Sequence, residues 1–162
     1  MKNFYIILVG LTAHLFFSAG AFADPGSSNY LSELGEGTVL EVLKDITVAA
    51  NTSSIYFMEG QAGSGAFSPK VCVNYCRIQI RSRTPKNRIV RKGTKIVVGA
   101  PYGGYVHKVS LTSPSEMTRL ECDKYTNDKA CKMDSNDWTI GALERQMNGL
   151  VKIIYPEPDE IQ

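Results

Sequence analysis

Hydrophobic and polar residues alternate along much of the chain, with the period of two that is typical of β-strands with one buried face. The clearest example is CRIQIR at residues 76–81, in which a cysteine and two isoleucines alternate with Arg77, Gln79 and Arg81. A strand with this pattern buries the cysteine and the isoleucines and turns the arginines toward solvent, with Arg83 continuing the outward set.

Other short stretches rich in β-branched or aromatic residues predict a series of strands separated by turn-forming residues. The stretch TVLEVLKDITV at 38–48 is interrupted by the charged pair Lys44-Asp45. Residues 84–87, TPKN, form a predicted turn, so we expect the strand at 76–83 to pair with a short partner at 88–91 in a hairpin. Further strands are expected at 54–58, 94–98, 105–111, 117–122 and 150–155.

One helix is expected before the last of these strands. Thr139 is an acceptable N-cap for it. Ile140, Leu143 and Met147 recur at helical spacing on one face, and the next glycine, Gly149, stands where a glycine commonly ends a helix. About seven short strands with one late helix predict a mainly β fold, an antiparallel β barrel or sandwich with a short C-terminal helix.

The N-terminal residues have the pattern of a secretory signal peptide. A short basic start is followed by an apolar run at 4–20 and by Ala21-Phe22-Ala23, the small-x-small motif of a cleavage site. The alternative is an uncleaved N-terminal anchor, but the apolar core is short and ends at a cleavage motif. After residue 20, no window is apolar over the length that a membrane span requires. We therefore expect export to the periplasm or the cell exterior. The expected divisions are a signal peptide (1–23), a flexible leader (24–37) with a short helical turn at 30–34, a single β-rich domain (38–155) and an acidic tail (156–162).

The four cysteines of an exported chain favour two disulfides. The spacings C-x3-C (Cys72, Cys76) and C-x8-C (Cys122, Cys131) do not match the C-x2-C-like pattern of a zinc site. Of the three connectivities, Cys72–Cys76 is the least natural, because residues four apart on a strand are about 13 Å from one another, too far for a disulfide. A turn between the two would remove that objection. The preferred pairing is Cys76–Cys122 with Cys72–Cys131.

The charges are segregated along the chain, although their sum is small. The chain has 18 Lys and Arg and 16 Asp and Glu, for a net charge of +2. No acidic residue lies between Glu59 and Glu116, whereas the stretch Lys70–Lys95 holds nine basic residues. Two arrangements fit this pattern, a basic face on the folded domain or a basic middle that pairs with the acidic ends.

This basic stretch is the candidate functional surface. Crowded like charges repel one another, an acidic partner would relieve the repulsion, and the guanidinium fork suits phosphate and carboxylate. The partner would be an anionic envelope component, such as lipopolysaccharide, acidic polysaccharide or a membrane surface, or an acidic protein; nucleic acid would be unusual for an exported domain. The alternative is a solvated or edge-protecting strand face, balanced by the chain's own acids. The candidate ligand-binding residues are Arg77, Arg81, Arg83, Lys86, Arg88, Arg91 and Lys92.

Patterns for catalysis and metal binding are poorly represented. His107 is the only histidine after residue 23, and it stands in a predicted strand without a nucleophile motif beside it. The acidic segment 123–137 lacks the spacing of an EF-hand calcium loop. The glycines at 60–65 are not followed by the Gly-Lys-Ser/Thr of a phosphate-binding loop. From these missing patterns together we predict neither a metal nor a cofactor. A further hypothesis is an aromatic binding patch formed by Gly99–Tyr105, Tyr56, Tyr75 and Trp138.

The pattern as a whole favours an exported, disulfide-bonded domain that acts by binding or as a structural accessory and not by catalysis. Two alternatives remain open at this point. One is a small secreted hydrolase that uses His107. The other is an envelope-associated module whose surface contacts a protein partner.

Overall fold

The computed structural model describes residues 29–63, 73–125 and 138–157. The predicted signal peptide, most of the acidic tail, Lys70, Cys72 and Cys131 lie outside these ranges, as does the predicted pairing Cys72–Cys131. Within the described ranges, no helix is long and apolar enough to cross a membrane.

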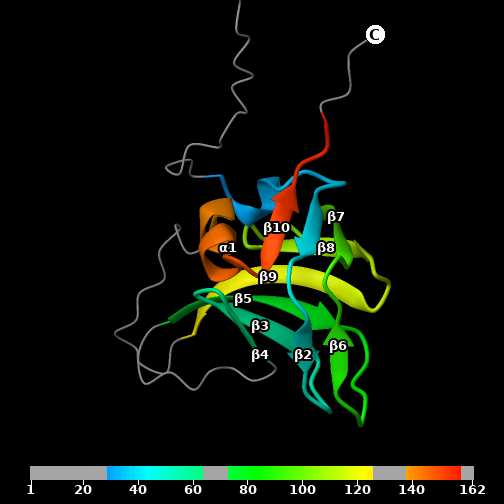
Figure 1. Ribbon diagram of the computed structural model, residues 1–162. Coiled ribbons are helices and arrows are strands. Elements are labelled where there is room, and N and C mark those ends of the chain that lie inside the picture. Colours follow the sequence, from blue (N-terminus) through cyan, green and yellow to red (C-terminus); the bar gives the residue numbers. More distant parts are fainter. Residues whose placement is uncertain (1–28, 64–72, 126–137, 158–162) are drawn as a thin grey trace, which may run out of the picture.

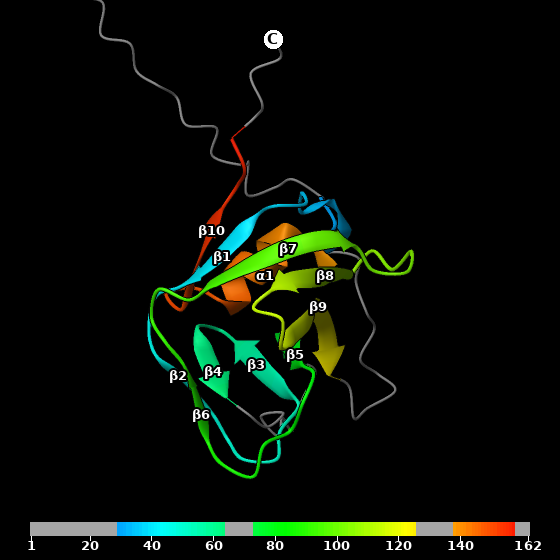
Figure 2. The ribbon, with the colours of Figure 1, turned by 90° about the vertical axis from the view of Figure 1, so that its right-hand side faces the viewer.

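Most of the strands form one antiparallel sheet of eight strands in the order β10-β1-β7-β8-β9-β5-β3-β4. The sheet curls into a half-barrel (Figure 1), which confirms the predicted mainly β, antiparallel fold with one helix. β2 and β6 form a separate two-stranded ribbon, which lies beside β4 in the lower part of the molecule in Figures 1 and 2. The strands are β1 (Val39–Val42), β2 (Ile46–Val48), β3 (Ser54–Met58), β4 (Gln61–Gly63), β5 (Val73–Ile80), β6 (Arg88–Val90), β7 (Lys95–Pro101), β8 (Lys108–Ser113), β9 (Met117–Tyr125) and β10 (Val151–Ile154).

One face of the curled sheet carries the hydrophobic core. The predicted alternation in β5 is confirmed, because Cys76, Ile78 and Ile80 are buried while the residues between them are partly exposed. Directly across the β5–β9 pair, Leu120 faces Ile78 and Cys122 faces Cys76. The two cysteines form the predicted disulfide. The β5–β9 pair is therefore joined by backbone hydrogen bonds, by core packing and by a covalent bond.

The helix α1 (Ile140–Gln146) packs against the same core. As predicted, Thr139 is its N-cap, and the Thr139 hydroxyl accepts a hydrogen bond of 3.1 Å from the Ala142 amide. Leu143 and Met147 are buried in the core. Gly149 has a φ of +69°, the left-handed conformation that glycine adopts without strain after a helix.

The folded unit begins before the predicted boundary at residue 38. The short 3-10 helix η1 (Leu31–Glu33) is present where a helical turn was expected, but it is part of the core and not of a flexible leader. Leu31 and Leu34 are both buried, and η1 contacts α1, β7 and β8. A leader of mostly polar residues with two leucines three apart can bury those leucines as one helical turn, and this packing fixes the segment.

The main sheet and the ribbon are connected by one long antiparallel ladder. Val39 pairs with Val97 in β1–β7, and Val48 pairs with Arg88 in β2–β6. The two strands have equal numbers of residues between these pairs, so the register is the same in both parts of the ladder. The ladder bends at the predicted interruption, Lys44-Asp45. This pairing corrects the predicted hairpin: β6 pairs with β2 and not with β5, which lies between β9 and β3 in the main sheet.

Candidate functional site

The seven predicted basic residues do not form a single surface. Arg77 lies in the middle of β5, on the outward face of the main sheet, between Glu121 of β9 and Tyr56 of β3. The other six lie beyond the end of β5, in the segment from Arg81 to Lys92 that contains β6. The two groups therefore need separate descriptions.

Arg77 is neutralised within the protein. Its guanidinium forms an ion pair with Glu121, and its Nη1 donates a hydrogen bond of 3.4 Å to the Tyr56 hydroxyl. Glu121 is only 2% exposed, and its second oxygen lies 3.1 Å from Nε of Arg119. Unlike the other predicted cations, Arg77 is therefore already neutralised by a carboxylate from a strand far along the chain.

Next to Arg77 and Glu121, two tyrosines cover part of the outward face of β5. The rings of Tyr56 and Tyr75 lie 5.6 Å apart. Burial, together with the charge of Asp123, raises the pKa of Tyr75 to about 12. The outward face of this strand is thus a packed polar layer and not a free row of cations.

The segment from Arg81 to Lys92 presents its cations to solvent. Arg81, Arg83, Lys86 and Lys92 are exposed, and none of their side chains has an acidic partner within the described part of the chain. Arg91 is also exposed, but it forms an ion pair of 2.8 Å with Asp45. Four of the seven predicted residues are therefore exposed without an acidic partner, and the half-buried Arg88 has none either.

Backbone and side-chain contacts hold the loop that carries Arg83 and Lys86. The Asn51 amide donates to the Thr84 carbonyl at 2.7 Å, and the Ala50 amide donates to the Asn87 side chain at 2.9 Å. At the base of the loop, Nη2 of Arg88 donates to the Ser82 carbonyl at 3.2 Å. The cations are therefore displayed on a loop tied to the turn between β2 and β3 and not on a free chain.

Asp45 sets the bend that brings Arg91 and Lys92 to this end of the molecule. Its carboxylate accepts a hydrogen bond of 2.8 Å from the Lys92 amide and one of 2.8 Å from the Arg91 guanidinium. The Lys92 amide, followed by Arg91, holds the pKa of Asp45 below its usual value. The ladder continues on the far side of the bend, where the Val42 amide donates to the Thr94 carbonyl at 2.9 Å.

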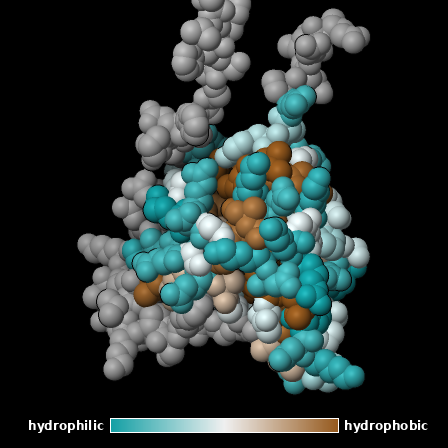
Figure 3. All heavy atoms as spheres, viewed as in Figure 1, coloured by the Kyte–Doolittle hydropathy of each residue, from teal (hydrophilic) through white to brown (hydrophobic). Residues whose placement is uncertain are grey.

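A groove of about 410 Å³ lies between the ribbon and the turn that joins β8 to β9. Figure 2 shows the strands of the ribbon from the side that lies to the right in Figure 1. In Figure 3, the region over β2 and β6 is mostly hydrophilic, with a few hydrophobic side chains set among the polar ones. The groove is lined by Val48, Ile80, Arg88, Ile89, Val90, Arg91, Thr94, Pro114, Glu116 and Met117.

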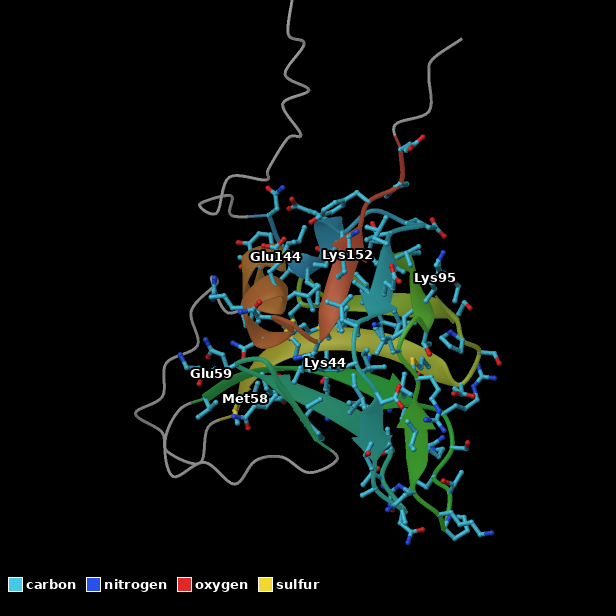
Figure 4. All side chains as sticks on the ribbon, in the orientation of Figure 1. Lys44, Met58, Glu59, Lys95, Glu144 and Lys152 are labelled. Atoms are coloured by element: carbon cyan, nitrogen blue, oxygen red, sulfur yellow. A yellow bond between two sulfur atoms is a disulfide. The ribbon has the colours of Figure 1, made fainter. Side chains whose placement is uncertain are left out.

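Part of the basic stretch is balanced by the acidic N-terminal segment. Glu41 of β1 stands opposite both Lys95 of β7 and Lys152 of β10 in the strand register. Figure 4 shows these two lysines on the strands that flank β1. Ion pairs within the described residues therefore account for Arg77 and Arg91. Lys95 only stands opposite Glu41 in the register, and the cations between Arg81 and Lys86 face solvent.

His107 lies among aromatic rings. Its imidazole is 5.3 Å from the ring of Trp138 and 5.7 Å from that of Tyr105. Burial, followed by the nearby charge of Lys108, lowers the pKa of His107 below 6.5. In the described part of the chain, its side chain makes no hydrogen bond or ion pair with a carboxylate or a hydroxyl, as a base in a catalytic triad would.

The aromatic residues form two clusters and not one patch. Tyr56 and Tyr75 lie over the outward face of β3 and β5, whereas Trp138 stacks on His107. Tyr102 and Tyr105, on the β7–β8 connection, are 42% and 51% exposed. Each has a cation over its ring, Arg119 at 4.9 Å and Lys108 at 4.4 Å respectively.

Metal-ligating side chains do not gather in the part of the chain that can be described, where no group of three or more His, Cys, Asp or Glu residues could hold an ion. Most of the acidic segment 123–137 lies outside that part. Comparisons of the chain with protein-family models, with curated proteins and with solved structures gave no match.

Several residues of this region could not be found from the sequence pattern. Asp45 was visible only as an interruption of a strand, and Pro114, Glu116 and Met117 only as a break and the start of the next one. Their contribution to the groove depends on the turn between β8 and β9 meeting a ribbon from elsewhere in the chain. The role of Glu121 likewise depends on its register with Arg77.

Proposed function

We propose that this protein is an exported, non-enzymatic binding domain that recognises an anionic ligand through the cations of the segment from Arg81 to Lys92. The observation that carries the proposal is the exposure of Arg81, Arg83, Lys86 and Lys92, without acidic partners in the described ranges, around one end of the fold. A cluster of like charges raises the local potential and attracts a counter-charge.

Two further features support binding over a merely solvated surface. The loop with Arg83 and Lys86 is held by several hydrogen bonds, so less conformational entropy is lost when these cations engage a ligand. The same segment also contributes Arg88, Ile89, Val90 and Arg91 to the lining of a groove. Concave sites of this size commonly hold ligands.

Export is supported by the N-terminal pattern and by the disulfide. Cys76 and Cys122 are bonded inside the core, and such bonds persist in oxidising compartments. When the chain is expressed with residues 1–23 in a secreting host, we expect a mature protein that begins at Asp24. Intact mass and N-terminal sequencing measure this, and recovery of the unprocessed chain from the cytosol would refute export.

The binding proposal is tested with an immobilised panel of lipopolysaccharide, acidic polysaccharide, anionic lipid vesicles and DNA, first at low and then at raised salt. We expect selective binding that weakens as salt rises, since counter-ions compete for the same cations. The variant Arg81→Glu/Arg83→Glu should weaken binding at least about tenfold, because two contacts with the anion become repulsive.

The matched control is Arg145→Glu/Lys152→Glu, which changes the net charge by the same amount on exposed residues of α1 and β10. It should bind as the wild type does. Both variants should keep a Tm within a few degrees of the wild type, a shift that corresponds to about 1 kcal/mol in unfolding free energy for a domain of this size. An equal loss in both variants would mean that only the net charge matters. Unchanged binding in Arg81→Glu/Arg83→Glu would exclude this segment as the site.

A further inference from the structure

The groove beside the ribbon combines an apolar floor with a cationic edge. Its floor is made of core residues, Val48, Ile80 and Met117, each less than 5% exposed. Ile89 also lines the groove and is 47% exposed, although it stands in the most basic part of the chain. Large exposed aliphatic side chains beside a concave apolar surface indicate a place where another apolar group binds.

The edge of the groove carries Arg88, whose guanidinium is incompletely satisfied. Its Nη2 donates to the Ser82 carbonyl, while its Nε is buried and has no hydrogen-bond partner in the described structure. A buried unpaired donor on a charged group is costly, and an anion next to the guanidinium offsets that cost. Arg91 contributes less, because it is already paired with Asp45.

One acid also lies at the groove. Glu116 is exposed, and its backbone carbonyl accepts a hydrogen bond of 2.7 Å from the Arg81 amide, which places Arg81 next to this edge. The charged residues that line the groove are Arg88, Arg91 and Glu116, so the lining carries more cations than acids. The groove is therefore apolar in its depth and cationic at its rim.

We infer that the ligand of this groove is an anionic amphiphile with a single alkyl chain, whose head lies at Arg88 and whose chain lies on the apolar floor. This inference rests on the proposed function and specifies its ligand class. A bare anion would leave Ile89 and the floor in contact with water. A neutral hydrocarbon would cover Arg88 and leave its charge unpaired, which burial penalises.

The test measures, by calorimetry, the binding of inorganic phosphate and of butyl, octyl and dodecyl phosphate to the purified, oxidised protein, below their micelle concentrations. Octanol, which has the same alkyl chain as octyl phosphate, serves as the uncharged probe. We expect affinity to rise about two- to fourfold for each methylene that the groove covers, the factor that corresponds to partial or full burial of one CH₂. Octanol should bind at least about tenfold more weakly than octyl phosphate, because it lacks the charge-assisted contact.

Two variants separate the head from the chain. Ile89→Gln should flatten the dependence on chain length, whereas its control Val106→Gln, which replaces an exposed aliphatic side chain away from the groove, should keep it. Arg88→Gln should lower the affinity of every alkyl phosphate at least about tenfold and leave octanol unchanged. If Arg88→Gln disturbs the fold, Arg88→Lys keeps the charge and should retain part of the affinity.

The outcomes are distinguishable from those of the binding proposal. Equal affinity for phosphate and all alkyl phosphates would overturn the amphiphile inference and leave anion binding intact. Equal affinity for octanol and octyl phosphate would overturn both. Binding to anionic vesicles without binding to any monomeric alkyl phosphate would also overturn the inference, since the surface would then contact a membrane without holding a single chain. The absence of binding to any of these probes would also overturn the amphiphile inference.

Discussion

Arg77 and Arg81 belong to the same alternating set of arginines, yet their environments differ completely. Arg77 stands opposite Glu121, which is 2% exposed and lies between Arg77 and Arg119. Arg81 follows the last residue of β5, and its side chain is exposed. A buried carboxylate needs the charge of its partners, so Arg77 and Arg119 are structural, whereas Arg81 is free to contact a ligand.

The variant Glu121→Gln should lower the free energy of unfolding by about 2 to 4 kcal/mol, because it leaves Arg77 and Arg119 side by side without the anion between them. Urea denaturation of wild type and variant measures the change. The control is Glu116→Gln, an exposed acid outside any described ion pair, which should change stability by less than about 0.5 kcal/mol. Similar effects of the two substitutions would contradict the structural role of Glu121.

At the scale of elements, the long ladder of β1–β7 and β2–β6 connects the half-barrel to the ribbon. The register is the same on both sides of the bend, so the bend interrupts the pairing without shifting it. Asp45 takes the place of the missing ladder contacts by binding the Lys92 amide and the Arg91 guanidinium. The orientation of the ribbon therefore depends on an exposed carboxylate, which makes it sensitive to pH.

The lowered pKa of Asp45 has a defined consequence for stability. A carboxyl whose pKa falls on folding stabilises the native state fully above its unfolded pKa of 3.8, and this contribution is lost as the pH falls through the folded value. The wild type should therefore exceed Asp45→Asn in unfolding free energy at neutral pH, and the gap should close as the pH falls below 3.8 and through the lowered pKa of the folded state. Urea titrations across this range measure the gap, and a constant gap would contradict the account.

The N-cap of α1 gives a second prediction for an element. Thr139→Ala removes the acceptor of the Ala142 amide and should cost about 1 kcal/mol in unfolding free energy. Thr139→Ser keeps the hydroxyl and should cost clearly less. Thermal unfolding followed by circular dichroism compares the three proteins. If Ser and Ala destabilise equally, the methyl group of Thr139 and not its capping hydroxyl is what the site requires.

Local pattern predicted most of the strands and which face is buried, but, apart from the pair joined by Cys76–Cys122, not which strands are neighbours. Alternation placed Cys76 and Ile78 inward correctly, because burial of one face is a property of a single strand. The hairpin was wrong, because the turn-forming residues 84–87 show only that the chain turns and not that the flanking strands pair. The neutralisation of Arg77 was missed for the same reason, since its partner lies far along the chain in β9.

At the scale of the whole molecule, the chain separates a stable core from a charged end. The half-barrel, α1 and the Cys76–Cys122 disulfide form the core, whereas the ribbon and the loop 81–87 project at one end (Figure 1). Within the described ranges, Arg81, Arg83, Lys86 and Lys92, which are exposed and have no acidic partner, lie at this end. The arrangement favours a rigid scaffold that presents one cationic surface to an anionic partner.

The most direct test of this account is to map where an anion binds. The backbone amide signals of the ¹⁵N-labelled, oxidised protein would be followed by NMR during titration with inorganic tripolyphosphate at low salt. We predict shifts that saturate and that concentrate in residues 81–92 and in the facing Asp45 and Glu116, with little change in α1 or around Glu121. Shifts confined to α1, to β10 or to the outward face of β5 and β9, or no saturable shifts at all, would contradict the assignment of the cationic end as the binding surface.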